Sequence, residues 1–387
     1  MADNKIYEFN LPTRIISGLG SINNLANIIR SYGDNVLLIT GKNSARKTGL
    51  LDKIANVISV STDIRLMEFE QVDPEPTCDI VDQAVALAKE KGSDVVVGLG
   101  GGSVLDVAKA AAAIVNKEGK VEDFMGGKEL VFPGIPCITV PTTAGSGAEV
   151  TPNAVLIDRT RQVKESFRHT FLYPKTAIID AELTLNLPAK VTAYSGIDAL
   201  SQSIESYVSL GANPLTDAIC TQSMRLISGN IREAFKNGQN IQARQNMLHG
   251  ALLSGIALAN ARMGAVHGIA HPLGVKYNLP HGLVCGVLLP YVMEFNINYV
   301  SGKYAQVAVL LGGLIRGLGK EQASKMAIDK VKQLLVEVAF PWRLRELGVK
   351  QEDFGQIAKD SMPSGSLKAN PRLVTEEDVI NILKKAY

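Results

Sequence analysis

The segment 94-DVVVGLGGGSVLDVAK-109 limits the possible folds more than any other part of the sequence. Its first half is a valine-rich run typical of a strand buried on both faces, and its second half has the apolar spacing of a helix. Similar patterns predict strands at 35–41, 65–72, 137–143 and 176–180, and helices at 78–92 and 103–119. Strands that alternate with helices predict a parallel sheet covered by helices on both sides.

The second half of the chain has a different pattern. Residues 190–265 and 300–387 contain long segments of period 3.6 and few strand signals. We therefore expect an α/β nucleotide-binding domain with a parallel sheet over residues 1–185 and an all-helical domain over residues 186–387.

The overall composition argues against several classes of partner. The 387 residues carry a formal net charge of only +2, so no charge excess indicates nucleic acid or an anionic membrane. The N-terminus has no apolar signal segment, and the longest apolar runs are shorter than a membrane span. The cysteines form no C-x-x-C pair and are expected to be buried free thiols, which fits a cytoplasmic protein. They are Cys78, Cys137, Cys220 and Cys285.

Two small-residue loops follow predicted strands. The glycines at 100–102 precede a helix, whose N-terminus can hold the pyrophosphate of a dinucleotide. The loop departs from the G-x-G-x-x-G pattern because Ser103 stands at the third glycine, and no G-K-[ST] follows. The second loop, 141-PTTAGSGAEVT-151, lies at the carboxyl end of another strand. A strand-to-helix turn without a ligand is the alternative, and the presence of two such loops argues against it.

Three of the five histidines fall within 266-VHGIAHPLGVKYNLPHG-282. His267 and His271 are four residues apart and share one helix face, and His281 follows after a loop. They would be ordinary core residues or, with a carboxylate, a metal site for zinc or iron. Asp198, within an apolar helical run, is the best candidate carboxylate. His169 and His249 are interpreted as surface or packing residues.

Five ordered motifs carry a resemblance that covers nearly the whole chain. They are GGGSVLDVAK, PTTAGSGAEVT, GIDALSQSIESYVS, VHGIAHPLG and LPHG. Together they resemble the iron-containing alcohol dehydrogenase family, which is related to glycerol dehydrogenases and dehydroquinate synthases. The resemblance implies a dehydroquinate synthase-like fold with the active site in the cleft between two domains.

The resemblance also implies the roles of individual residues. The cofactor-binding candidates are Gly100, Gly101, Gly102, Ser103, Asp106, Thr142, Thr143 and Ser146. The metal-ligand positions of the family correspond to Asp198, Gln202, His267 and His281, and His271 matches a histidine near the nicotinamide and substrate.

Gln202 departs from the family pattern, which has a histidine there. An amide oxygen is a weaker ligand than an imidazole nitrogen and suits harder cations. Three interpretations stay open. Asp198, His267 and His281 bind iron or zinc with water or Gln202 in the fourth position, or the metal is held weakly, or the protein works without metal.

The segment 40-TGKNSARK-47 bears on the choice of cofactor. Many NAD-using members resemble a pattern with Asp where Gly41 stands, and that acid would repel a 2′-phosphate. Here Gly41 is neutral, and Lys42, Ser44 and Arg46 offer contacts to a phosphate. NADP is slightly favoured over NAD.

The expected function is that of an NAD(P)-dependent alcohol dehydrogenase or aldehyde reductase with metal as Lewis acid, acting on a small molecule as a homo-oligomer, dimer or larger. The alternative is a metal-independent reductase of an anionic aldehyde, with Arg262 or Lys276 as the cation; a surface ion pair is the simpler interpretation of Arg262. A dehydroquinate synthase-type cyclase and a lapsed nucleotide-binding protein are the remaining hypotheses.

Overall fold

The computed structural model describes residues 6–59, 63–161 and 163–387, which form two compact units. The α/β unit comprises residues 12–187 and 238–248, and the helical unit comprises the remaining described residues. The main division therefore falls after Leu187, whereas the sequence analysis placed it after residue 185. Residues 6–11 belong to the helical unit rather than to the α/β domain, because the N–H of Asn10 donates to Oδ1 of Asn260 (2.6 Å).

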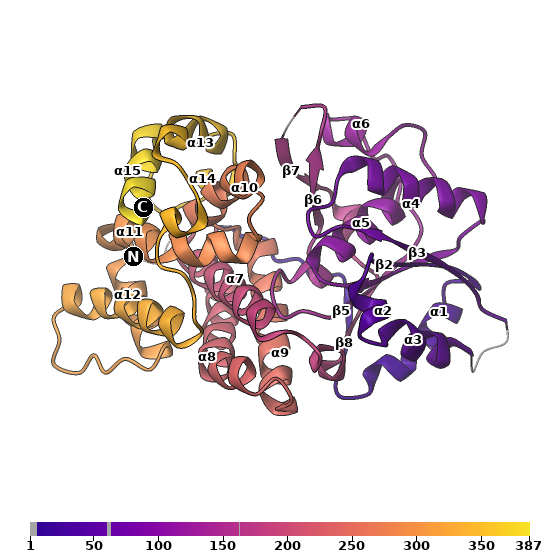
Figure 1. Ribbon diagram of the computed structural model, residues 1–387, viewed down its shortest axis with the longest axis horizontal. Coiled ribbons are helices and arrows are strands. Elements are labelled where there is room, and N and C mark those ends of the chain that lie inside the picture. Colours follow the sequence, from indigo (N-terminus) through magenta and orange to yellow (C-terminus); the bar gives the residue numbers. More distant parts are fainter. Residues whose placement is uncertain (1–5, 60–62, 162) are drawn as a thin grey trace. The chain divides into compact units, whose positions relative to one another are not determined.

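Within the described residues, six strands form one parallel sheet in the order β1-β8-β5-β4-β2-β3 (Figure 1). The strands are β1 (Arg14–Ser17), β2 (Asn35–Gly41), β3 (Arg65–Val72), β4 (Val95–Gly100), β5 (Cys137–Pro141) and β8 (Thr176–Ile179). The parallel α/β fold expected from the sequence is confirmed.

Apolar cores lie on both faces of this sheet, as β2 shows. Leu37 and Ile39 belong to a core built with α4 and α5, whereas Val36 and Leu38 belong to a second core built with α1 and α3. Figure 1 shows these two pairs of helices on opposite sides of the sheet. The helices of the unit are α1 (Leu25–Arg30), α2 (Ser44–Lys47), α3 (Leu50–Ser59), α4 (Cys78–Glu90), α5 (Gly102–Ile114) and α6 (Val121–Met125).

Three strands were not anticipated. β1 is a half-exposed edge strand of four residues, too short to give a clear apolar pattern. β6 (Asn153–Asp158) and β7 (Val163–Arg168) pair antiparallel in a separate two-stranded sheet. Only alternate residues of β6 are buried, so this hairpin lacks the continuous apolar run that identifies the central strands.

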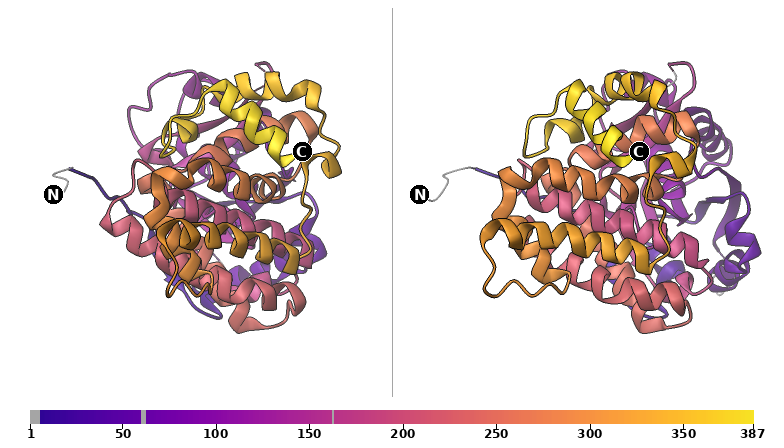
Figure 2. Two further views of the ribbon diagram at one scale, coloured as in Figure 1. Left: turned by 90° about the vertical axis from the view of Figure 1, so that its left-hand side faces the viewer. Right: turned by 60° about the vertical axis from the view of Figure 1, so that its left-hand side comes forward.

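The helical unit confirms the expected change of structure in the second half of the chain. Its helices are α7 (Ala189–Val208), α8 (Pro214–Lys236), α9 (Ile241–Ala261, whose first turns belong to the α/β unit), α10 (Ala265–Tyr277), α11 (His281–Leu310), α12 (Lys320–Glu337), α13 (Phe354–Ser361), α14 (Gly365–Lys368) and α15 (Glu376–Ala386). α7 packs against α8 and α11, and α11 also contacts α10 and α12. The last helices, yellow in Figure 2, pack against α10 and α11.

Among the described helices, α11 is long and apolar enough to cross a membrane by length and composition alone. In this structure 67% of the 18-residue apolar stretch of this helix is buried inside the protein. Its apolar character is thus used in packing against α7, α10 and α12.

Candidate functional site

The glycine run joins β4 to α5 through Gly101, the N-cap residue of the helix. Position 100 requires glycine because a Cβ there would lie 2.7 Å from the Cβ of Val104 in the first helical turn. Gly101 makes no side-chain cap, so no side chain satisfies the first N–H groups of α5 in that way. These N–H groups and the positive end of the helix dipole are suited to an anion such as a pyrophosphate.

The second predicted loop lies beside the first. The N–H of Thr142 donates to the carbonyl of Gly100 (2.9 Å), and a Cβ on Gly102 would lie 2.5 Å from Oγ of Ser146. Because β4 and β5 are parallel neighbours, both loops lie at the carboxyl edge of the sheet, where open α/β sheets bind ligands. The structure thus brings together Gly100, Gly101, Gly102, Thr142, Thr143 and Ser146.

Ser103 and Asp106, two other predicted cofactor residues, have partners inside the protein. The Ser103 hydroxyl donates to the carbonyl of Pro74. Asp106 accepts from the N–H of Val155 (2.9 Å) and pairs with the fully buried Nζ of Lys109 (3.0 Å). These contacts anchor the first turns of α5, and therefore the orientation of the helix N-terminus.

Gly41, Lys42 and Ser44 lie between the end of β2 and the start of α2. Two of the three cations of the segment 40–47, Lys42 and Arg46, have acidic partners on or just after β3. Nζ of Lys42 lies 2.6 Å from Asp73, and the guanidinium of Arg46 lies 2.5 Å from Glu70 and 3.5 Å from Glu68. An arriving phosphate would have to compete with these carboxylates.

Three helices of the other unit bring the predicted metal ligands together. Asp198 lies on α7 and His267 on α10, and His281 is the first residue of α11. Oδ1 of Asp198 is 3.5 Å from Nε2 of His267 and 3.7 Å from Nε2 of His281. Among the described residues, neither Oδ1 of Asp198 nor Nε2 of His267 has a hydrogen-bond partner. Such buried atoms are costly unless a partner binds them, and a divalent cation would supply one.

Glu205, which the sequence analysis did not single out, fixes the orientation of His267. Its Oε2 contacts Nδ1 of His267, and its Oε1 accepts from the N–H of Val266 (2.7 Å) at the start of α10. A carboxylate on Nδ1 directs Nε2 toward a metal. Glu205 follows Asp198 by seven residues and shares its helix face, so spacing alone offered a signal.

The pKa of His267 reflects the burial of its ring and the groups that surround it. Burial by itself lowers this pKa, but Cys285, Glu205 and Asp198 around the ring together raise it well above the ordinary value of 6.5. The cluster therefore favours positive charge at this position, whether a proton or a metal ion.

Gln202 does not direct its amide oxygen at Asp198. Its Nε2 donates to Oδ2 of Asp198 (3.1 Å), and its Oε1 accepts from the hydroxyl of Ser254 (2.9 Å). An ionised carboxylate can only accept, so the amide nitrogen is the atom that must face it. Gln202 thereby orients Asp198 through one oxygen and leaves Oδ1 directed toward His267 and His281.

Glycine at position 282 allows α11 to begin against α7. A Cβ there would lie 2.3 Å from the carbonyl oxygen of Tyr194 and 3.1 Å from the Cβ of Asp198. His271, one turn after His267, has its ring centroid 5.1 Å from that of His281. It is only half-buried, so it lies between the cluster and the solvent-exposed part of α10.

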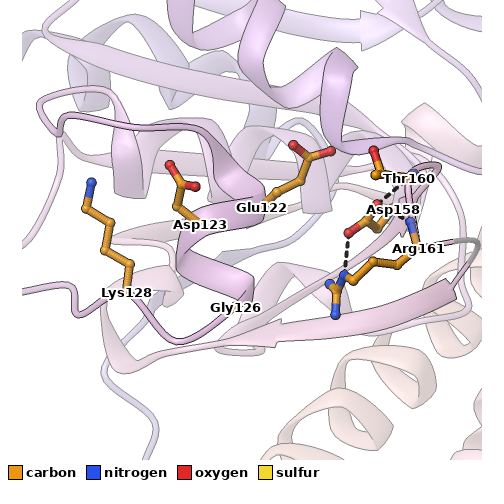
Figure 3. Close-up of a pocket in the computed structure, with 7 residues that line it drawn as sticks. All are labelled: Glu122, Asp123, Gly126, Lys128, Asp158, Thr160 and Arg161. Atoms are coloured by element: carbon orange, nitrogen blue, oxygen red, sulfur yellow. Dashed lines mark hydrogen bonds and ion pairs between the residues drawn. The ribbon is translucent and has the colours of Figure 1, made fainter.

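A separate pocket of the α/β unit lies between α6 and the hairpin of β6 and β7 (Figure 3). Asp158 in its wall accepts from Nε of Arg161 (2.6 Å) and from the N–H of Thr160 (2.8 Å). None of its lining residues belongs to the two small-residue loops. Its lining residues Asp158 and Arg161 form an ion pair, and we assign the pocket no part in the candidate cofactor site.

Two family models match the sequence and together cover most of it. The model of iron-containing alcohol dehydrogenase matches residues 12–181, and that of the C-terminal part of the Fe-containing alcohol dehydrogenase family matches residues 192–387. The chain belongs to the iron-containing alcohol dehydrogenase family. The enzyme is thus an oxidoreductase that acts on CH–OH groups, and the resemblance given by the five motifs is confirmed.

This dehydrogenase is similar to other proteins over nearly its whole length. The NAD-dependent methanol dehydrogenase of Bacillus methanolicus is 34% identical over 98% of this chain and 99% of its own. The sulfoacetaldehyde reductase of Bilophila wadsworthia is 33% identical over 97% of each chain. The crystal structure of a 1,3-propanediol oxidoreductase is 34% identical, with a TM-score of 0.96 over 99% of this chain and 100% of that one.

The roles of the individual site residues, a shared cleft, the homo-oligomeric state and the cytoplasmic location stay predictions.

Proposed function

We propose that the enzyme transfers hydride between C4 of a nicotinamide cofactor and the carbonyl carbon of a small aldehyde, reversibly, with a metal ion held by Asp198, His267 and His281. The proposal is carried by the convergence of side chains from three helices, because the Nε2 atoms of His267 and His281 lie 3.5 Å and 3.7 Å from Oδ1 of Asp198. When bound, the metal would act as a Lewis acid on the substrate oxygen and stabilise the developing alkoxide.

The surrounding residues fit a metal ion. Glu205 keeps Nδ1 of His267 engaged, so that Nε2 is the nitrogen presented to the cation. Gln202 does the same for Asp198 by engaging Oδ2. The two atoms left without hydrogen-bond partners among the described residues, Oδ1 of Asp198 and Nε2 of His267, support this interpretation over a metal-free site.

The small-residue loops are proposed to hold the cofactor through backbone groups. The pyrophosphate would be bound by the N–H groups that begin α5, next to Thr142, Thr143 and Ser146. The nicotinamide supplies or accepts the hydride, and the loops set its position.

His271 is proposed to carry a proton between the substrate oxygen and solvent. Its half-buried ring beside His281 supports this role, because a proton relay needs one side toward the reacting oxygen and another toward water.

The ion pairs near β2 change the expected cofactor preference. Lys42 and Arg46 face three carboxylates, those of Asp73, Glu70 and Glu68, so these two cations offer no surplus of positive charge. We therefore propose NAD(H) rather than the slightly favoured NADP(H). The ratio of kcat/KM values for NADH and NADPH tests this, and a preference for NADPH would contradict it.

An anionic aldehyde is a second candidate substrate. Arg262 is exposed and makes no ion pair with any described residue, unlike Lys276, which pairs with Asp353 (3.0 Å). A surface ion pair at Arg262 is therefore not found in the described part of the chain. The similarity to a protein named sulfoacetaldehyde reductase supports testing such substrates.

The decisive experiment follows NADH consumption with neutral and anionic aldehydes before chelation, after chelation, and after addition of zinc or iron. We expect continuous turnover that chelation removes and metal restores. Turnover unaffected by thorough metal removal would contradict the Lewis-acid role. No turnover on any aldehyde would instead favour the cyclase or the lapsed binding protein.

A further inference from the structure

Cys285 lies one helical turn after His281 on α11 and contacts the same cluster. It is fully buried, and its Sγ is 3.5 Å from Nε2 of His281. The potential ligand atoms of Asp198, His267, His281 and Cys285 all lie within 4.8 Å of one another. We propose that Cys285 is the fourth protein ligand of the metal, that Gln202 is not a ligand, and that the substrate oxygen would enter as a fifth ligand, an expansion that catalytic zinc sites allow. This inference rests on the metal centre proposed above.

The spacing of the atoms supports this assignment. A tetrahedral ion with ligands at about 2.0–2.3 Å requires ligand atoms about 3.3–3.8 Å apart. Asp198 Oδ1 lies 3.5 Å and 3.7 Å from the nitrogens of His267 and His281, and His281 Nε2 lies 3.5 Å from Cys285 Sγ. Three of the six edges of the tetrahedron thus already have the required length.

Gln202 is a poor alternative because its amide is already used on both sides. To coordinate a metal, its oxygen would have to leave the Ser254 hydroxyl, and the bond from Nε2 to Asp198 would have to break or rearrange. Asp198 would then lose the contact that orients it. Cys285 would give up only its contact with His281 Nε2, and both atoms of that contact would then bind the metal.

Metal binding by these four ligands balances both protons and charge. On binding, the thiol proton passes to solvent and a sulfur–metal bond forms, so that two anionic donors and two neutral imidazoles surround a divalent ion. A thiolate is a soft donor, and a site with one sulfur, two nitrogens and one oxygen favours zinc over harder cations. The inference therefore favours zinc, in an enzyme whose family is named for iron.

The test is to load the metal-free full-length enzyme with Co²⁺ and record its near-ultraviolet absorption. A thiolate ligand gives a sulfur-to-cobalt charge-transfer band. We expect one cobalt per chain with this band in the parent, loss of the band in Cys285→Ser, and retention in Gln202→Ala. Cys220→Ser is the matched control, because Cys220 is an equally buried thiol of the helical unit outside the cluster.

The outcomes separate this inference from the proposed function. Stoichiometric cobalt without the band in the parent, or a band that survives in Cys285→Ser, overturns the cysteine assignment and leaves the metal centre intact. Failure to bind any cobalt overturns the metal centre itself. If Cys285→Ser does not fold, X-ray absorption of the zinc-loaded parent decides, since a sulfur neighbour at about 2.3 Å is expected and its absence would refute the assignment.

Discussion

The candidate site of the α/β unit consists of backbone groups, whereas the candidate site of the helical unit consists of side chains. In the α/β unit the cofactor loops offer backbone N–H groups at the start of α5, and their glycines keep side chains away from that position. In the helical unit the site consists of side-chain atoms contributed by α7, α10 and α11.

The difference determines how each site responds to substitution. A backbone site is lost when a side chain is added, whereas a side-chain site is lost when one donor is removed. Buried glutamates in the two units also differ in their partners. Glu205 in the helical unit has an imidazole partner, whereas Oε1 of Glu149 in the α/β unit has no hydrogen-bond partner among the described residues.

The largest expected effect is that of Asp198→Asn in the helical unit. The substitution removes the carboxylate donor of the cluster. We expect activity to fall at least about 1,000-fold, because loss of an outer partner of a ligand alone costs about 10–100-fold. Metal content should fall with it, while NADH binding measured by fluorescence stays unchanged. Weakened NADH binding would show that Asp198 also supports the cofactor.

Glu149→Gln probes the buried acid of the α/β unit. Burial raises the pKa of Glu149 from 4.5 to about 7. Between these values the unfolded chain ionises while the folded chain keeps the proton, so stability falls as pH rises from 4.5 to 7. The variant should match the parent at pH 4 and exceed its free energy of unfolding by about 3 kcal/mol at pH 8. Denaturant titrations at both pH values measure this, and a constant difference would refute the assigned pKa.

Gly102→Val adds a side chain where the two cofactor loops meet. Its Cβ would lie 2.5 Å from Oγ and 3.0 Å from Cβ of Ser146, so the Ser146 side chain or its loop must shift. We expect KM for NADH to rise about tenfold, the loss of roughly one hydrogen bond to a charged group, with metal content unchanged. Gly229→Ala is the control, because no atom of the described residues lies within 4 Å of a Cβ at that exposed position. An unchanged KM in the valine variant would place the cofactor elsewhere.

The smallest effect concerns backbone strain at the end of α9. Arg262 has a φ of 64° and donates its N–H to the carbonyl of Leu258, a helix ending that glycine normally provides. Arg262→Gly should stabilise the protein by about 1 kcal/mol in denaturant unfolding. If the substrate is an anionic aldehyde, KM for it should rise in the same variant while KM for a neutral aldehyde does not. A loss of stability would mean that the arginine side chain makes contacts that outweigh the strain.

The sequence predicted the α/β unit, with its backbone site, better than the helical unit, with its side-chain site. β2 and β3 have the predicted bounds because each is a complete strand-like run, and glycines directly mark where the chain must approach a helix. β1 was missed because four half-exposed residues carry little pattern. In the helical unit the sequence supplied the candidate ligands Asp198, His267 and His281, since histidine clusters are conspicuous.

The sequence could not supply the contacts between helices. Gln202 was assigned a ligand position by its place in a motif, whereas its bonds to Asp198 and Ser254 depend on the packing of α9 against α7. Glu205 was passed over because its contact with His267 forms only when α7 and α10 meet. Cys285 was interpreted as a buried free thiol, although its four-residue spacing from His281 already placed both on one helix face. The spacing on a single helix showed which residues share a face, but it did not show what that face meets.

The central claim is that Asp198, His267 and His281 hold a catalytic metal in the helical unit. Elemental analysis of enzyme purified without chelator, with activity measured on the same samples during stepwise metal removal, tests it most directly. We predict close to one zinc or iron per chain and activity that declines in proportion to the metal removed. Full activity in protein that contains no metal would contradict the account.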